Sequence, residues 1–226
     1  MNLFNFSPPT EDEFSLTYLL RIAQMNGISN LNHFFNNVVF DTPCSICSTK
    51  DISYSGSYTG MEFPVNKLIQ CLPTGDVAQL DSSRFLMEHT LFPLFSPFFG
   101  SDSQKEEFIH KYCSYSGYIS AMEFIKCNRK CLYLCPSCML DDKNKYGFPY
   151  VHRIHQAPGV YVCPIHHKPL VLSSFGKSMD PFEQLIEKND VFDPVSKAKY
   201  LVAHKSITVD LNKPINWVNL AKELEL

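Results

Sequence analysis

Hydrophobic residues in the first forty positions of the chain recur at helical spacing. In TEDEFSLTYLLRIAQMNG the apolar face is formed by Leu16, Leu19, Leu20 and Ala23. Thr10 and Glu13 have the spacing of a capping box, which starts a helix, and Gly27 suits the position just after its end. After a tight connection, SNLNHFFNNVV carries a second apolar face, formed by Leu31, Phe34, Phe35 and Val38. The pattern predicts either a helix-turn-helix pair or a plain helical hairpin of the core.

A more aromatic pattern follows in residues 41–122. PVNKLIQCL predicts a short helix, and SQKEEFIHKYCSYSGYISAMEFIKC predicts two helices that separate near Ser116 and Gly117. Between them, FLMEHTLFPLFSPFFG is interrupted by Pro93 and Pro97, which exclude one long regular helix. This stretch is expected to be either a buried, irregular packing segment or a partner-binding surface, whose contact residues would be Phe92, Phe95, Phe98 and Phe99.

The period of the pattern changes after Lys130. The runs CLYLC, FPYVHRIHQ, GVYVC and KPLVL are short, β-type and separated by Pro and Gly, whereas CMLDDKNKYG predicts a helical turn that ends at Gly147. INWVNLAKELEL predicts a last helix that begins at Asn216. The sequence therefore predicts an α+β fold. Its expected parts are a mostly helical region at 1–122, a small β ribbon at 123–175 and a segment at 176–226 that starts a further helical domain.

A repeated Cys-Pro motif lies in the β-type region. The first copy is Cys135-Pro-Ser-Cys138, and Cys163-Pro-Ile-His166 follows after 24 residues. Two ligands separated by two residues can point from one tight turn at a common ion, and Zn²⁺ prefers four Cys or His ligands in a tetrahedron. The proline in each motif restricts the turn backbone and lowers the entropy cost of closure. We predict one structural Zn²⁺ site with Cys135, Cys138, Cys163 and His166 as ligands. The alternatives are His167 as the fourth ligand and reduced cysteines that only pack in the core.

The other cysteines carry weaker signals. Cys44 and Cys47 form another pair with two intervening residues, and Cys127 and Cys131 are separated by three. A second metal site built from these residues lacks a matching His/Cys turn, so one zinc ion is expected rather than two. Cys71 and Cys113 have the surroundings of ordinary core cysteines.

The net charge of the 226-residue chain is only −3, which excludes a polycation that coats nucleic acid. The charge is uneven, because residues 1–122 carry 6 basic and 12 acidic side chains, whereas residues 123–168 carry 7 and 3. An anionic partner is therefore expected at the second segment. The candidate DNA contacts are Arg129, Lys130, Lys143, Lys145, His152, Arg153 and His155. Strand alternation in YVHRIHQ would place Arg153 and His155 on one face; the alternative for each is a plain solvated face.

The sequence contains no pattern typical of a hydrolase or transferase. Glu88 and His89 could form an acid–base pair but lack a nucleophile, and there is no glycine-rich phosphate loop, so no enzymatic activity is expected. MNLFNFSPPTEDEF lacks the basic and apolar parts of a signal peptide, and no apolar stretch of about 18 residues could span a bilayer. The expected compartment is the cytoplasm, where cysteines remain reduced and available to a metal.

The ordered motifs resemble the TnsD/TniQ family of transposon target-selection proteins. The resemblance rests on PPTEDEFSLTYLLRIAQMNG, on LCPSCMLDDKNKYGFPYVHRIHQAPGVYVCPIHHKPL and, for the TnsD branch, on EHTLFPLFSPFFG. It covers about residues 8–172 and is specific, because order, spacing and flanking residues all agree.

The resemblance implies a non-catalytic adaptor of a bacterial transposon, bound to the nucleoid when on DNA. Such an adaptor recognises a double-stranded attachment site, recruits the AAA+ ATPase TnsC and reaches the transposase subunits indirectly. TnsD-type proteins are longer than 226 residues, so the chain is expected to be an N-terminal part of one. The alternative is a zinc-stabilised interaction module that binds the ATPase without contacting DNA, which the acidic charge of residues 1–122 favours.

Overall fold

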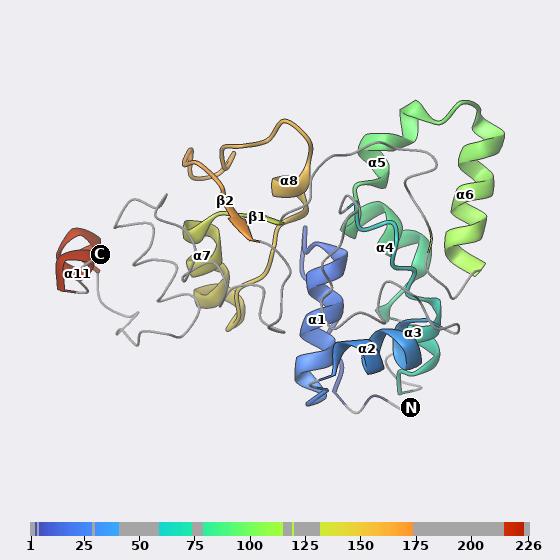
Figure 1. Cartoon of the computed structure of the whole chain (residues 1–226), viewed down its shortest axis with the longest axis horizontal. Helices are drawn as coiled ribbons and strands as arrows, with labels where there is room; N and C mark the ends of the chain where they lie inside the picture. Colours follow the sequence, from blue (N-terminus) through green and yellow to red (C-terminus); the bar gives the residue numbers. More distant parts are fainter. Residues whose placement is uncertain are drawn as a thin grey trace.

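Helices dominate the computed structural model. The residues it describes are 3, 5–28, 30–40, 59–73, 79–114, 119, 132–173 and 215–223. The first part contains α1 (Ser15–Met25), α2 (Leu31–Phe34), the π-helical turn η1 (Phe35–Val39), α3 (Asn66–Gln70), α4 (Ser82–His89), α5 (Phe92–Phe95), the 3-10 turn η4 (Ser96–Phe98) and α6 (Asp102–Ser114). The second contains β1 (Leu132–Leu134), α7 (Pro136–Tyr146), α8 (Arg153–Gln156), β2 (Val171–Ser173) and α11 (Trp217–Glu223). The predicted α+β class is confirmed (Figure 1).

Helix α1 starts later than the capping pattern predicts. Thr10 and Glu13 do bond reciprocally, since Glu13 N donates to Thr10 O (3.1 Å) and Thr10 N donates to a Glu13 carboxylate oxygen (2.9 Å). These bonds close a turn before the helix, because Asp12 has a positive φ of 58° and Glu13 pairs as a β-bridge with His152. The end is as predicted: Gly27 has a φ of 66°, which glycine adopts without strain.

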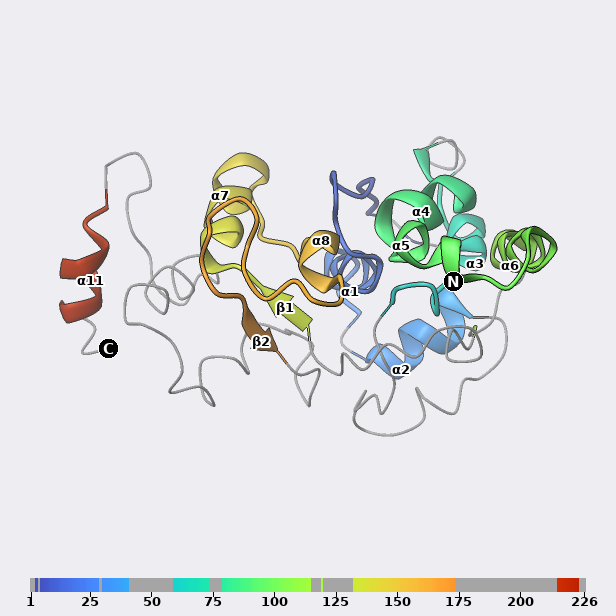
Figure 2. The same ribbon diagram turned by 90° about the horizontal axis from the view of Figure 1, so that it is seen from above.

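Helix α1 is the centre of the described fold. Figures 1 and 2 show it between α2 and α4 on one side and α7 and α8 on the other. Every residue from Ser15 to Leu20 is buried. One buried apolar cluster contains residues of α1 together with Leu132, Leu134, Met139, Leu140 and Val151. Residues 132–173, which we term the metal-site unit, therefore share a core with the N-terminal helices.

The predicted second helix forms as α2 followed by η1. The Asn30 side chain accepts a hydrogen bond from His33 N at 3.0 Å, which caps the start of α2. Phe34, Phe35 and Val38 are buried as predicted. Phe35 also packs on Phe63, with ring centroids 5.6 Å apart. The pair of helices thus exists, and its apolar face belongs to the core.

The aromatic stretch forms several short helices, as its prolines predict. Pro93 lies in the first turn of α5 and Pro97 in η4. Phe92 is fully buried and stacks on Phe108 of α6, with ring centroids 5.7 Å apart. In contrast, Phe98 is 76% exposed. The stretch therefore supplies both core and surface, rather than one continuous aromatic face.

The metal-site unit is less β-rich than the sequence predicts. β1 and β2 pair antiparallel, with Leu132 opposite Ser173, and α7 ends at Gly147, whose φ is 84°. The predicted strand FPYVHRIHQ is wrong, because Arg153–Gln156 is α8. The reason is distant in sequence: the Asp12 carboxylate accepts a hydrogen bond from Ile154 N at 3.2 Å and pairs with Arg153 at 3.1 Å. GVYVC contributes only a bridge between Val162 and Pro169.

Several predictions lie outside the described residues. They concern the Cys44/Cys47 and Cys127/Cys131 pairs, the candidate contacts Arg129 and Lys130, the helix expected after Gly117, and most of 176–226. The last helix is confirmed as α11, and the Asn216 side chain caps it by accepting a hydrogen bond from Asn219 N at 3.1 Å. Among the described helices, none has the length and apolar character needed to cross a lipid bilayer.

Candidate metal centre

The four predicted ligands converge on one point. Cys135 is the N-cap residue of α7, Cys138 lies in its first turn, and Cys163 and His166 lie on the turn before β2. One donor atom from each of the four lies within 4.8 Å of the others. Cys138 Sγ lies 3.5 Å from Cys163 Sγ and 3.2 Å from His166 Nδ1, and Cys135 Sγ lies 3.6 Å from the same nitrogen.

The local sequence explains both turns. Pro136 occupies the first position of α7, where its missing N–H costs no hydrogen bond. In the second turn, His167 N donates to Cys163 O and Cys163 N donates to Lys168 O, both at 2.8 Å. His167 has a positive φ of 52°, which reverses the chain there. The reversal lets His166, rather than His167, join the three cysteines.

Two further side chains support the cluster. Asp141 Oδ2 lies 2.8 Å from His166 Nε2, on the side of the imidazole ring away from the sulfur atoms. His155 Nε2 lies 3.9 Å from Cys138 Sγ, and burial lowers the pKa of His155 to about 4. His155 is therefore neutral. Carboxylates and N–H groups in such positions orient metal ligands and fix the imidazole tautomer.

The donor set fits a soft or borderline cation. Three thiolates and one imidazole would fill a tetrahedron, and a metal–sulfur bond of about 2.3 Å implies sulfur atoms roughly 3.7 Å apart. The 3.5 Å separation of Cys138 and Cys163 is close to this value. The cysteines are almost fully buried and Leu170 packs against them, so water is largely excluded. A site whose four positions are all protein ligands is structural, because no position remains for a substrate or an activated water.

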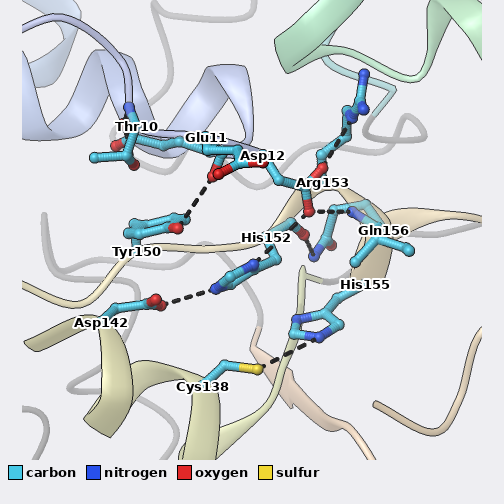
Figure 3. A network of polar contacts seen from close by, with 12 residues as sticks. Thr10, Glu11, Asp12, Cys138, Asp142, Tyr150, His152, Arg153, His155 and Gln156 are labelled. Atoms are coloured by element: carbon cyan, nitrogen blue, oxygen red, sulfur yellow. Dashed lines mark hydrogen bonds and ion pairs between the residues drawn. The ribbon is translucent and has the colours of Figure 1, made fainter. Parts of the chain in front are cut away.

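A polar network links the metal-site unit to the N-terminal segment (Figure 3). His152 Nε2 lies 2.8 Å from Asp142 of α7, and His152 Nδ1 lies 3.7 Å from Asp12. Burial lowers the pKa of His152, but the hydrogen bonds and charges of both aspartates outweigh it and raise the pKa to about 9. His152 is therefore cationic at neutral pH. Tyr150 adds a hydrogen bond from its hydroxyl to Glu11 O at 3.0 Å.

The basic candidates occupy different environments. Lys145 is exposed and Lys143 is half-buried, both near the C-terminal end of α7. Arg153 pairs with Asp12 and also donates to Met87 O at 2.6 Å. His152 and His155 are only 9% and 1% exposed. The strand-face argument, which paired Arg153 with His155, is wrong because Arg153–Gln156 is helical, and both histidines belong to the interior network.

The aromatic candidates for partner binding also differ in their exposure to solvent. Phe92 is buried, and Phe95 and Phe99 are half-buried against the helical core. Phe98 alone of the four is strongly exposed. The sequence reading missed Leu94, which is 44% exposed on the same stretch.

The residues around the ligands were missed as well. Asp12, Asp141 and Asp142 were not among the predicted site residues, and His155 was predicted only as a DNA contact. Helical spacing could have indicated two of these residues. Asp141 and Asp142 follow Cys138 by three and four positions and so lie on the same side of α7 as this ligand.

The described fold thus combines a mostly helical core with a Cys₃His cluster that could hold one metal ion. The TniQ family model matches residues 5–170, so the chain belongs to the TniQ family, whose members are non-catalytic, transposon-associated adaptors. No curated protein matches the chain. The matched range ends at Leu170, just past the last ligand, and thus contains the whole metal cluster.

Proposed function

We propose that the chain is the target-selection adaptor of a Tns-type transposon, of the TnsD branch. In this role it binds a double-stranded attachment site and recruits the AAA+ ATPase TnsC, which in turn acts on the transposase. The observation that carries the proposal is the family match over residues 5–170. EHTLFPLFSPFFG supports the TnsD branch. The protein would work in the bacterial cytoplasm, on nucleoid DNA.

Zn²⁺ is the ion proposed for the Cys₃His cluster. Three thiolates and an imidazole match the ligand preference of zinc, and the separations of the donor atoms fit its bond lengths. Zinc would contribute free energy of folding, since the unfolded chain does not hold its four ligands together. Elemental analysis of protein purified without added metal tests the proposal, and about one zinc per chain is expected.

The proposed DNA contact is the basic part of the chain around α7. Residues 123–168 have an excess of four positive charges, and the exposed end of α7 carries Lys143 and Lys145. Arg129 and Lys130 remain candidates from the sequence. Binding should weaken with salt, with a slope of log affinity against log salt of about −0.9 for each phosphate neutralised.

A charge-reversal experiment tests this half of the function. Lys143→Glu with Lys145→Glu should weaken duplex binding and reduce the salt slope, as measured by fluorescence anisotropy with candidate attachment-site DNA. Lys111→Glu is the matched control, because Lys111 is an exposed lysine of α6. Equal losses in both variants would indicate a non-specific charge effect and count against the assignment to α7.

The second candidate function is an interaction module that binds the ATPase without contacting DNA. The observation that favours it is the excess of six acidic charges in residues 1–122, together with the exposed Phe98. A pull-down of purified TnsC-type ATPase with and without duplex DNA separates the two. Recruitment that needs DNA supports the adaptor, whereas recruitment without any duplex affinity supports the module.

A further inference from the structure

Asp12 holds the start of α8 from the other end of the chain. Its carbonyl oxygen accepts a hydrogen bond from Arg153 N at 2.7 Å, and its carboxylate accepts one from Ile154 N at 3.2 Å. The carboxylate also pairs with the Arg153 guanidinium at 3.1 Å and lies 3.7 Å from His152 Nδ1. Asp12, His152 and Arg153 lie together in Figure 3. These contacts cap the first turn of α8 and fix its direction.

Helix α8 in turn places His155 beside the metal cluster. His155 follows directly after Ile154, and its backbone N donates to His152 O at 3.2 Å. Its side chain is buried, and Nε2 lies 3.9 Å from Cys138 Sγ (Figure 3). Because α8 has only four residues, its own hydrogen bonds stabilise it weakly. The contacts from Asp12 therefore decide where the imidazole ring of His155 lies.

A second connection runs from Asp12 through His152 to α7. His152 Nε2 lies 2.8 Å from Asp142 Oδ2, on the opposite side of the ring from Asp12. Helix α7 carries two of the four ligands, since Cys135 is its N-cap residue and Cys138 lies in its first turn. A displacement of His152 therefore acts on the helix that holds half of the donor set.

The backbone of Asp12 also indicates that the surrounding structure holds this residue in place. Its φ of 58° lies in the left-handed region, which costs free energy for a residue other than glycine. Such a conformation persists where neighbouring contacts fix it. The next residues supply these contacts, since Glu13 forms a β-bridge with His152 and Phe14 N donates to Val151 O at 2.8 Å. The N-terminal segment is thus docked on the metal-site unit at Asp12.

We propose that Asp12 is a positioning residue for the metal site, although in the described part of the chain it contacts none of the four ligands. Through α8 it holds His155 against Cys138, and through His152 it fixes the position of α7. The N-terminal segment thereby determines how tightly the metal-site unit binds its ion. The inference rests on the proposed function only for the presence of zinc in the cluster.

The test measures the zinc affinity of the full 226-residue chain by competition with a chromophoric chelator. Asp12→Ala should lower this affinity at least tenfold, as is typical when a residue that supports metal ligands is lost. Asp12→Asn should lose less, because its amide oxygen can still accept from Ile154 N and asparagine also adopts a positive φ. The double variant Asp12→Ala with His155→Ala should lose less than the product of the two single losses, because Asp12 acts partly through His155.

The cobalt-substituted protein supplies a readout that a loss of stability alone would not change. Asp12→Ala and His155→Ala should shift the cysteine-to-cobalt charge-transfer band in the same direction, since both disturb the contact of His155 with Cys138. Asp81→Ala is the matched control. Asp81 is the N-cap residue of α4 and accepts a hydrogen bond from Arg84 N at 2.7 Å, so this variant loses a similar cap away from the metal site. It should keep the zinc affinity and the cobalt spectrum of the wild type.

Three results would overturn the inference: wild-type zinc affinity in Asp12→Ala, single losses that multiply in the double variant, or an equal loss in Asp81→Ala. The proposed function fails in a different way. If the wild-type chain itself bound no zinc, the assignment of the ion to the cluster would be wrong, and the role of Asp12 would be overturned with it. If the wild type bound zinc and Asp12→Ala had the same affinity and cobalt spectrum, only the role of Asp12 would be overturned.

Discussion

His166 presents its two ring nitrogens to different partners: Nε2 lies 2.8 Å from Asp141 Oδ2, whereas Nδ1 faces the sulfur atoms. The carboxylate therefore accepts the Nε2 hydrogen and leaves the Nδ1 lone pair for a metal ion. We predict that Asp141→Asn lowers zinc affinity about 10- to 100-fold, whereas Asp141→Glu retains most of it. Competition with a chromophoric chelator measures the affinity.

The control for this prediction is Lys145→Ala, an exposed change on the same helix that should leave zinc affinity unaltered. Nitrogen-15 spectra of the histidine rings provide a second readout, because Asp141→Asn should loosen the preference of His166 for the Nε2–H tautomer. Unaltered affinity and an unaltered tautomer would show that Asp141 is only a surface ion-pair partner.

Removing the metal should destabilise more than the metal-site unit. Residues of that unit pack in the same buried cluster as α1, so a chelator is expected to lower the melting temperature of the helical core as well. Cys138→Ser should abolish the effect of the chelator, because the variant cannot bind the metal ion tightly. The substitution itself should lower the free energy of unfolding by about 3 kcal/mol or more. Circular dichroism melts with and without chelator measure both effects.

Cys71→Ser supplies the comparison for this experiment, because Cys71 is a buried cysteine of the core cluster rather than a ligand. This variant should keep the full response to chelator. If Cys138→Ser responded to chelator in the same way, the proposed coordination would be wrong.

Local signals in the sequence were sufficient for much of the fold. Gly27 and Gly147 end helices as predicted because both have a positive φ. Pro93 and Pro97 divide the aromatic stretch because proline is tolerated in the first turn of a helix but not further inside it. The four ligands were predictable for the same reason, since each pair is set by a short turn encoded within four residues.

Prediction from the sequence failed where the contact that determines the local structure comes from a residue far away in the chain. YVHRIHQ alternates like a strand, yet α8 forms because a carboxylate 142 positions upstream of Ile154 accepts its N–H. No local pattern contains that partner. Likewise, aromatic content alone could not separate the buried Phe92 from the exposed Phe98, because tertiary packing against Phe108 decides which of them is core.

The interior pair of Glu13 and Arg21 should be a major source of stability. Glu13 is fully buried, and Arg21 contacts both its carboxylate oxygens, at 2.9 and 2.7 Å. Removing one partner strands the other charge in the core, which typically costs about 3–5 kcal/mol. We expect Glu13→Ala to lower the free energy of unfolding by that amount. The double variant Glu13→Leu with Arg21→Met should recover part of the loss, and urea unfolding measures both.

His152 should make stability depend on pH above neutrality. Its pKa in the folded protein is about 9, against an ordinary value of 6.5, so its contribution is fully present below pH 6.5 and is lost as the pH rises towards 9. The expected loss is about 2–3 kcal/mol. His152→Gln cannot carry the charge and should lack this dependence. If the free energy of unfolding of the wild type and of the variant changed equally between pH 6.5 and 9, the cationic state of His152 would be contradicted.

Ionisation of Glu62 should likewise lower the free energy of unfolding as the pH rises, but at a lower pH than that of His152. It is buried beside Met61 and Tyr112; one carboxylate oxygen accepts a hydrogen bond from the Thr59 hydroxyl at 2.8 Å, and the other has no partner among the described residues. Burial raises the pKa of Glu62 from 4.5 to about 7, despite the hydrogen bond from Thr59. The unfolded chain then loses its proton first as the pH rises, so stability should fall by up to about 3 kcal/mol between pH 4.5 and 7 and level off above.

The variant Glu62→Gln isolates this effect, because glutamine keeps the shape of a protonated glutamic acid and cannot ionise. We expect the free energy of unfolding of the variant to equal that of the wild type near pH 4.5 and to exceed it above pH 7. The difference between the two proteins, measured by urea unfolding at successive pH values, removes the contribution of every group that they share. A difference that stayed constant across this range would mean that Glu62 ionises normally and that its buried oxygen has found a partner.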